Sequence, residues 1–195
     1  MSPNRNEPAI HVASGAFKGR RLRYPRTSAL RPTMQRTREA VVDSLGDDLA
    51  GVGFVDLYAG AGAVGIEALS RRAAFVRFVE RESETLACLD DNLRTLGLDA
   101  SRASVYRGEV ESFVASGGLD DERIRIVFAD PPYHEDVHSL LALLDAKAYP
   151  HVRCLVVEHR GDLTAPGLSH WAVTRSRRYG ATRVTYFEPC QGGKP

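Results

Sequence analysis

Short apolar runs and amphipathic stripes alternate along most of the chain. Runs rich in β-branched or aromatic residues predict five strands, at residues 53–58, 75–79, 104–107, 124–129 and 153–157. Apolar residues at helical spacing predict helices at residues 40–49, 66–72, 86–96 and 137–144. Strands that alternate with helices in this way are typical of an α/β fold, in which a mostly parallel sheet lies between helices.

Two hairpins are predicted near the ends of this pattern. Residues 10–12 and 21–23 flank a short segment with two Ser-Gly or Lys-Gly pairs, which favours a small amino-terminal hairpin. Residues 171–178 and 183–187 flank a Tyr-Gly pair and predict an antiparallel hairpin. The second hairpin brings the expected doubly wound sheet to seven strands.

A glycine-rich turn follows the first strand of this sheet. Gly60, Gly62 and Gly65 let the backbone approach a ligand closely, with a helix amino terminus behind them. Their spacing also fits the dinucleotide fingerprint, since Glu80 comes 20 residues after Gly60 at the end of the second strand. A nicotinamide oxidoreductase is therefore one candidate. Asp56 argues against it, because a carboxylate at the mouth of the first strand, four residues before Gly60, would repel a pyrophosphate. It would suit a cationic amino-acid group, either directly or through water.

A second motif comes directly after the apolar run at residues 124–129: Asp130, Pro131, Pro132 and Tyr133. Ligands of open α/β sheets bind beyond the carboxyl ends of the strands. Prolines carry no N–H, so this turn offers a carboxylate and free carbonyl oxygens, which can accept both hydrogens of an exocyclic amine. Tyr133 adds a ring on which a base can stack. Hydride transfer gives these residues no role. In isolation they would only end a strand with a tight turn.

Basic residues are concentrated at the amino end. Residues 1–38 contain nine Arg or Lys and one acidic residue, whereas the other 157 residues contain 17 basic and 24 acidic ones. A basic arm on an acidic domain suggests a polyanionic partner, because phosphate neutralisation dominates nucleic-acid affinity. We expect residues 1–50 to form a nucleic-acid-binding extension of a catalytic domain at residues 51–195. Arg175, Arg177 and Arg178 either extend the basic surface or line a solvated strand edge.

Several motifs together resemble a known family. The segment DLYAGAGAVG at residues 56–65, Glu80 and the Asp-Pro-Pro-Tyr motif are similar to those of class I S-adenosylmethionine-dependent amino-methyltransferases. FKGRRL at residues 17–22, LRPT at 30–33 and RTRE at 36–39 resemble the small bacterial family that methylates N2 of one guanine in 16S ribosomal RNA. The resemblance covers residues 10–188, and two positions depart from the family's pattern, Gln35 and Glu109.

The resemblance implies a fold, a cofactor and a set of site residues. It implies the Rossmann-like sheet of class I methyltransferases, with the amino-terminal hairpin and helix added to it. S-adenosylmethionine would be held by Asp56, Tyr58, Ala59, Gly60, Gly62, Gly65, Glu80, Glu109 and Val110. The catalytic residues would be Asp130, Pro131, Pro132 and Tyr133. The predicted RNA contacts are Lys18, Arg20, Arg21, Arg23, Arg31, Arg36 and Arg38.

The remaining features restrict where and on what the protein acts. No apolar stretch approaches the ~20 residues of a membrane span, and Cys88, Cys154 and Cys190 lack metal-site spacing. We expect a cytoplasmic monomer without a metal, acting on 16S ribosomal RNA either naked or in the 30S particle. A DNA adenine-N6 or cytosine-N4 methyltransferase, a protein glutamine methyltransferase and the nicotinamide enzyme stay open as alternatives.

Overall fold

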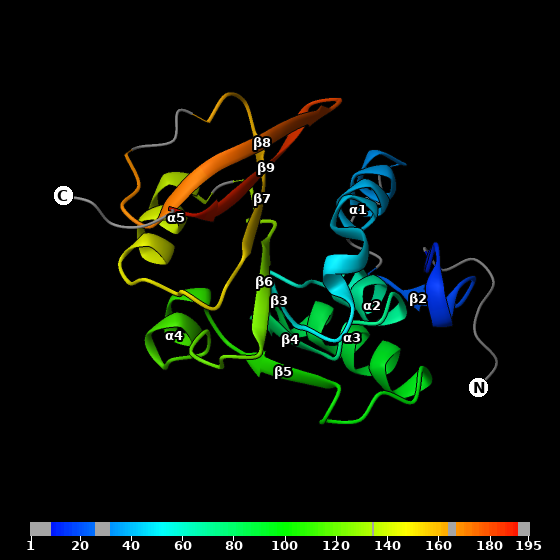
Figure 1. Ribbon diagram of the computed structural model, residues 1–195. Coiled ribbons are helices and arrows are strands. Elements are labelled where there is room, and N and C mark those ends of the chain that lie inside the picture. The colour runs from blue at the N-terminus through cyan, green and yellow to red at the C-terminus, as the bar shows by residue number, and fades with distance from the viewer. Residues whose placement is uncertain (1–8, 26–31, 134, 164–166, 191–195) are drawn as a thin grey trace.

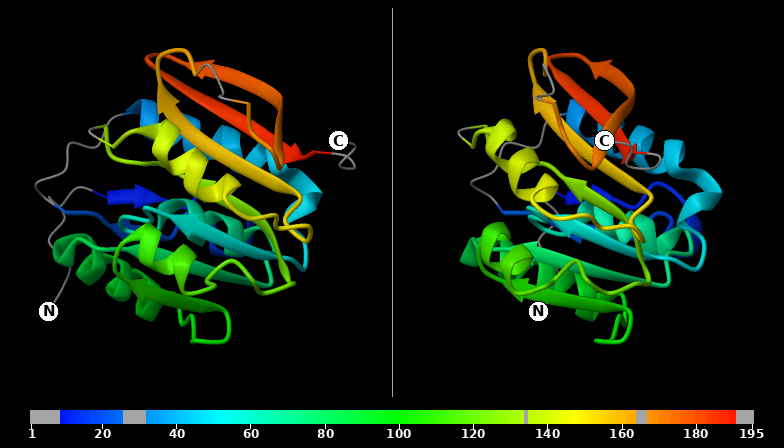
Figure 2. Two further views of the ribbon diagram at one scale, coloured as in Figure 1. Left: turned by 90° about the vertical axis from the view of Figure 1, so that its left-hand side faces the viewer. Right: turned by 60° about the vertical axis from the view of Figure 1, so that its left-hand side comes forward.

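The computed structural model describes residues 9–25, 32–133, 135–163 and 167–190. Its main feature is a seven-stranded sheet (Figures 1 and 2). From one edge to the other the strands are β5 (Ala103–Arg107), β4 (Phe75–Glu80), β3 (Gly53–Leu57), β6 (Ile124–Ala129), β7 (Cys154–Arg160), β9 (Thr182–Pro189) and β8 (Trp171–Tyr179). The first five are parallel, while β9 runs antiparallel to both of its neighbours.

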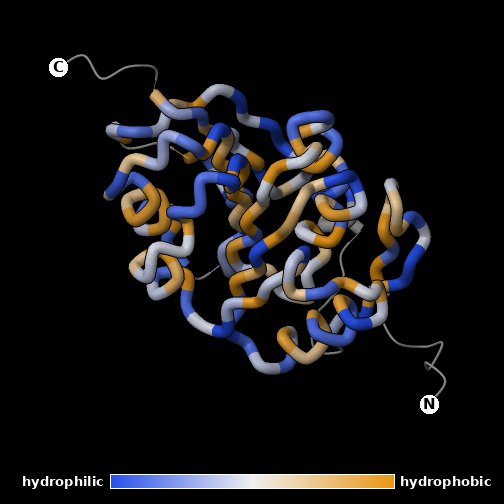
Figure 3. Tube along the Cα trace, turned by 60° about the horizontal axis from the view of Figure 1, so that its bottom comes forward, coloured by the Kyte–Doolittle hydropathy of each residue, from blue (hydrophilic) through white to orange (hydrophobic). Residues whose placement is uncertain are grey.

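Helices cover both faces of the sheet. One face carries α1 (Pro32–Leu45), α2 (Ala63–Ser70) and α3 (Ser83–Thr95), and the other carries α4 (Val110–Ala115) and α5 (Val137–Asp145) (Figure 1). Each layer buries its own apolar cluster, one containing Val42, Ile66 and Leu89 and the other Phe113 and Leu141. Hydrophobic and hydrophilic residues alternate along the helices, as their amphipathic patterns require (Figure 3).

The amino-terminal residues form a hairpin of β1 (Ala9–His11) and β2 (Arg21–Arg23). Ile10, Val12 and Leu22 are buried in the apolar cluster that also contains α1 and α2. The buried carboxylate of Glu67 on α2 accepts the backbone N–H groups of Ala13 at 2.9 Å and Ser14 at 3.0 Å. The hairpin is therefore fixed to the domain by apolar burial and by hydrogen bonds, and it shares the core of residues 51–195.

The predicted strands and hairpins are confirmed, and β6 has the predicted bounds. Strand β7 continues to Arg160, three residues beyond the predicted end, because it pairs with β9 as far as Arg160. Helix α2 begins at Ala63, earlier than predicted, and α4 was not predicted as a helix. No helix in the described ranges has both the length and the apolarity that a membrane span requires.

Candidate active site

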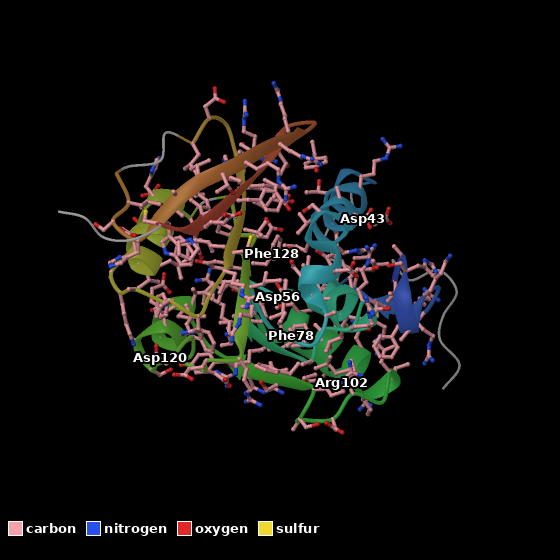
Figure 4. All side chains as sticks on the ribbon, in the orientation of Figure 1. Asp43, Asp56, Phe78, Arg102, Asp120 and Phe128 are labelled. Carbon is pink, nitrogen blue, oxygen red and sulfur yellow. The ribbon has the colours of Figure 1, made fainter. Side chains whose placement is uncertain are left out.

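Acidic side chains end several neighbouring strands at the same edge of the sheet. Asp56 is the fourth residue of β3, Glu80 ends β4, and Asp130 directly follows β6. Asp56 pairs with Phe78 of β4 and with Phe128 of β6, and Figure 4 places these three residues together at the centre of the sheet. The parallel arrangement thus brings the predicted cofactor motif and the predicted catalytic motif to one edge of the sheet, where open α/β sheets form their ligand-binding crevice.

Two carboxylates, of Asp56 and Glu80, accept hydrogen bonds from the backbone of the glycine-rich segment. The Gly60 N–H donates to Glu80 Oε2 at 2.7 Å, and the Gly65 N–H donates to Asp56 Oδ2 at 2.8 Å. Gly62 caps α2 in the left-handed conformation with a φ of 83°, which favours glycine. A Cβ at Gly60 would meet no atom of the described residues within 4 Å, so these residues leave open space beside the loop.

The Glu80 carboxylate accepts three backbone N–H groups. Besides the Gly60 N–H, its Oε1 accepts the N–H groups of Arg81 and Glu82, each at 2.8 Å. Ala59 also donates its N–H to the Val79 carbonyl at 2.9 Å, which ties the loop to the end of β4. A carboxylate has about four acceptor positions, so Glu80 keeps one for a hydroxyl group after these three bonds.

Asp56 lies deeper than the predicted position at the mouth of the strand. It is 1% exposed, and its carboxylate accepts the Gly65 N–H at the start of α2. Burial raises the pKa of Asp56 to about 8, although the hydrogen bond from Gly65 acts in the opposite direction. Asp56 is therefore placed to orient the loop and the start of α2, without direct access to the crevice in this conformation.

A chain of side chains joins the ends of β3, β4 and β5. Arg81 Nη1 lies 2.9 Å from Glu109 Oε2 and 3.5 Å from Glu135 Oε1. Tyr58 has a positive φ of 61°, and burial, followed by the hydrogen bond with Glu135, raises the pKa of its hydroxyl. Such a backbone conformation costs ~1–3 kcal/mol for a non-glycine residue, which is common at functional sites. Arg81 and Glu135 were not predicted from the sequence.

Glu109 and Val110, which the resemblance assigns to the cofactor site, lie at the start of α4. Glu109 precedes this helix, and its half-exposed carboxylate pairs with Arg81. Val110 is buried in the apolar cluster of α4 and α5. The structure thus places the Glu109 side chain at the surface beside Arg81 and the Val110 side chain in the core.

A pocket of about 220 Å³ lies at the ends of β6 and β7, lined by Asp130, Pro131, Pro132, Tyr133 and Glu158 among others. Burial raises the pKa of Asp130 to about 6. Burial also raises the pKa of Glu158 to about 8, and the charge of Asp130 adds to the effect. The pocket is thus an acidic site with two partly buried carboxyl groups, which can accept hydrogen bonds from a ligand.

Tyr133 stands at the mouth of this pocket and is 63% exposed. The guanidinium carbon of Arg160 lies 3.5 Å from the centre of the Tyr133 ring, which is a cation–π contact. One face of the ring is therefore covered by Arg160. A base that stacks on Tyr133 must use the other face or displace this side chain.

The hairpin approaches the carboxylates of Asp130 and Glu80 through Tyr24, the residue after β2. Burial raises the pKa of Tyr24, and the charges of Asp130 and Glu80 raise it further. Tyr24 thus lies near both the cofactor carboxylate and the catalytic one. Sequence reasoning did not assign it a role.

The residues predicted to contact RNA differ in how far their side chains are exposed. Lys18 and Arg36 are exposed, Arg20 donates to the Thr95 carbonyl at 2.9 Å, and Arg23 forms an ion pair with Asp91. Arg21 is half-buried, and Arg31 lies outside the described residues, as does the side chain of Gln35.

Arg38 is buried, so the structure does not support its prediction as an RNA contact. It is 5% exposed and donates to the His11 carbonyl at 3.0 Å, so it joins α1 to the hairpin.

In the carboxyl-terminal hairpin, Arg175 covers the Tyr186 ring with 3.8 Å between guanidinium carbon and ring centre. Strand β8 forms the edge of the sheet.

Glu158 is the site residue that sequence reasoning missed most clearly. The rule that located Asp56, Glu80 and Asp130 also applies to the next parallel strand, and β7 was predicted to end at Val157. Glu158 then follows directly and would have been a candidate.

Among the described residues, no group of His, Cys, Asp and Glu side chains is arranged to hold a metal ion.

Known proteins share this fold and much of this sequence. The ribosomal RNA small subunit methyltransferase D of Escherichia coli strain K12 is 37% identical over 182 residues, which cover 92% of this chain and 89% of that protein. The solved structure of a hypothetical protein from Thermus thermophilus is 30% identical, with a TM-score of 0.74, and the match covers 92% of this chain and 99% of that one.

A more distant structure shows the fold alone. Magnesium protoporphyrin IX methyltransferase from Synechocystis PCC 6803, solved with bound SAM, has a TM-score of 0.61 at 13% identity, over 80% of this chain and 79% of that one. The sheet is thus that of class I methyltransferases. The sequence also matches a family over residues 10–188, and the chain therefore belongs to the family described as Conserved hypothetical protein 95.

Proposed function

We propose that this protein transfers a methyl group from S-adenosylmethionine to the exocyclic N2 of a guanine in 16S ribosomal RNA. The observation that carries the proposal is that the two motifs follow neighbouring strands at one edge of the sheet. The glycine loop, anchored by Glu80, and the pocket of Asp130 both lie at the carboxyl ends of adjacent strands. The E. coli relative is named a methyltransferase of ribosomal RNA of the small subunit, which supports the substrate.

The residues of the loop suit S-adenosylmethionine. The space beside Gly60 admits a ligand against the backbone, and Glu80 has an acceptor position left for a ribose hydroxyl. We propose that Glu109 and Val110 flank the adenine and that Asp56 acts through the loop. When bound, the cofactor supplies a methyl group that is attached to a positively charged sulfonium. After the transfer, the rest of the cofactor is a neutral thioether.

The pocket residues position the amine for this transfer. We propose that the Asp130 carboxylate and the Pro131 carbonyl each accept one hydrogen of the exocyclic amine, which turns the nitrogen lone pair toward the methyl group. Correct alignment alone can contribute ~7–11 kcal/mol to lowering the barrier. Once the methyl group is attached, the nitrogen loses one proton, and Asp130 is close enough to accept it.

The base must leave its stack to enter the pocket, which costs a few kcal/mol unless it is already unpaired. We propose that the exposed face of Tyr133 stacks on it. Lys18, Arg36 and the basic residues of the hairpin would hold the phosphates around it, since phosphate contacts position a nucleic acid without reading its sequence.

The test is to map tritiated methyl transfer onto unmodified 16S RNA, onto 30S particles assembled from it, and onto DNA and protein controls. The proposal expects label at N2 of one guanine in one or both RNA substrates. Label on adenine or cytosine of DNA, or on protein glutamine, would overturn it. So would binding of NADH without binding of S-adenosylhomocysteine.

A further inference from the structure

Glu158 lies beside Asp130 in the same pocket, and the methyl transfer proposed above leaves it without a role. We propose that Glu158 selects guanine by accepting the ring N1–H of the base whose N2 amine is held by Asp130. This inference rests on the proposed function and specifies how the same site distinguishes its substrate from other amines.

The sheet sets the two carboxylates next to each other. Strands β6 and β7 are parallel neighbours, and Ala129 pairs with Val157. Asp130 directly follows Ala129 at the end of β6, and Glu158 follows Val157 within β7. The preceding pair, Phe128 and Val156, is buried in the apolar cluster of the α1–α3 face, so side-chain alternation points Asp130 and Glu158 to that same face.

Neither carboxylate has a hydrogen-bond donor among the side chains and backbone groups that the structure describes. The nearby acids of the rim are already engaged: Asp136 caps α5, and Asp162 pairs with Arg183 at 2.7 Å. His159 is bonded to Thr185 at 2.8 Å, and Arg160 covers Tyr133. Two adjacent, partly buried acceptors therefore face the pocket, and a ligand edge with adjacent donors complements them.

Guanine has such an edge, whereas the other amino bases do not. Its N1–H donor adjoins the N2 amine, so one edge presents donors to both carboxylates. In adenine and cytosine the ring nitrogen next to the amine carries a lone pair and no hydrogen. The ionised form of Glu158, which dominates above its pKa of about 8, would be repelled by that lone pair and left unpaired, which is how a polar site rejects a near-isostere.

The test uses 2-aminopurine, which keeps the N2 amine but carries a lone pair at N1. First, the methylated guanine is mapped; then 16S RNA is ligated with 2-aminopurine at that position and assembled into 30S particles. Single-turnover methyl transfer is measured on both substrates at a pH above the pKa values of Asp130 and Glu158. Wild-type protein should prefer guanine by at least about 10-fold, the factor for one hydrogen bond to a charged group.

Glu158→Gln should lower this preference by about 10-fold or more. The new amide can donate to the N1 lone pair of 2-aminopurine, and its carbonyl can still accept from guanine. Because 2-aminopurine also lacks the guanine carbonyl oxygen, the comparison between the two proteins carries the test. Glu158→Asp keeps an ionised acceptor and should keep the preference within a few-fold, so it serves if the glutamine variant folds poorly.

Asp162→Asn is the matched control, because it removes a rim carboxylate that is 86% exposed and should leave the preference unchanged. An unchanged preference in Glu158→Gln, with normal binding of S-adenosylhomocysteine, would overturn the inference and leave the proposed function standing. A wild-type protein that labels no guanine at all would overturn both.

Discussion

Asn92 joins the amino-terminal hairpin to the glycine loop. Its Oδ1 accepts the Arg23 N–H at 2.7 Å, and its Nδ2 donates to the Arg23 carbonyl at 3.0 Å and to the Ala61 carbonyl at 2.9 Å. The side chain is almost completely buried on α3. One amide thus fixes the segment proposed to bind RNA relative to the segment proposed to bind the cofactor.

Replacing this amide should weaken both segments. Asn92→Leu has a similar volume but leaves buried backbone groups of Arg23 and Ala61 without partners, which costs about 1–3 kcal/mol per buried group. Urea unfolding should show the loss of stability, and calorimetry should show weaker binding of S-adenosylhomocysteine. Asp90→Asn on the same helix breaks only an exposed ion pair with Arg107 and should cost ~0–1 kcal/mol. Equal stabilities of the two variants would refute this role of Asn92.

Glu80→Ala should strongly reduce cofactor affinity. The change removes the acceptor proposed for the ribose and also releases the N–H groups of Gly60, Arg81 and Glu82. Hydrogen bonds to charged groups contribute about 1.5–3 kcal/mol, so we expect the dissociation constant of S-adenosylhomocysteine to rise by at least 10-fold in calorimetry. Glu82→Ala removes a neighbouring exposed carboxylate and should leave the affinity near that of the wild type. If Glu80→Ala binds normally, Glu80 does not hold the cofactor.

Charge reversal on the hairpin tests the RNA surface better than deletion does, because deleting the hairpin would expose the core around Leu22. Lys18→Glu should weaken RNA binding about equally across sequences. It should also lower the slope of log affinity against log salt by ~0.7–0.9. Lys147→Glu makes the same change of charge beyond α5, far along the chain, and should have little effect. Identical salt slopes for both variants would move the RNA surface elsewhere.

The buried carboxyl of Asp56 predicts a dependence of stability on pH. Its pKa in the folded protein is about 8, above the ordinary 3.8, so the folded state retains a proton that the unfolded state loses. The free energy of unfolding should therefore fall as the pH rises from about 4 to about 8. Asp56→Asn should reduce this fall by at least about 1 kcal/mol, the value of a one-unit pKa shift. Parallel pH profiles in urea unfolding would show that Asp56 ionises normally.

The strands that carry the site were predictable because each is a short apolar run followed by a polar motif. Glycine spacing located the loop, and the prolines located the pocket of Asp130. The sequence did not show that Asp56 is covered, because burial depends on how α2 packs over β3. Nor did it show that Arg38 points inward. Both outcomes depend on tertiary packing, which periodicity along one element does not contain.

The partners of predicted residues were equally hidden. Arg160 covers Tyr133 from the end of β7, and Tyr24 approaches Asp130 from the hairpin. These pairs are far apart along the chain, and no local pattern links them. Glu158 was the exception, since the rule that parallel strands end at one edge would have identified it.

The rate of methyl transfer by Asp130→Ala tests the central claim most directly. We expect the activation free energy of single-turnover transfer to 16S RNA or 30S particles to rise by about 3–4 kcal/mol, which lowers the rate. The affinity for S-adenosylhomocysteine should not change. Asp136→Ala, which removes a helix cap at the rim of the same pocket, should keep the rate and lose only about 1 kcal/mol of stability. If Asp130→Ala transfers methyl groups at the wild-type rate, Asp130 does not orient the amine and the proposed mechanism is wrong.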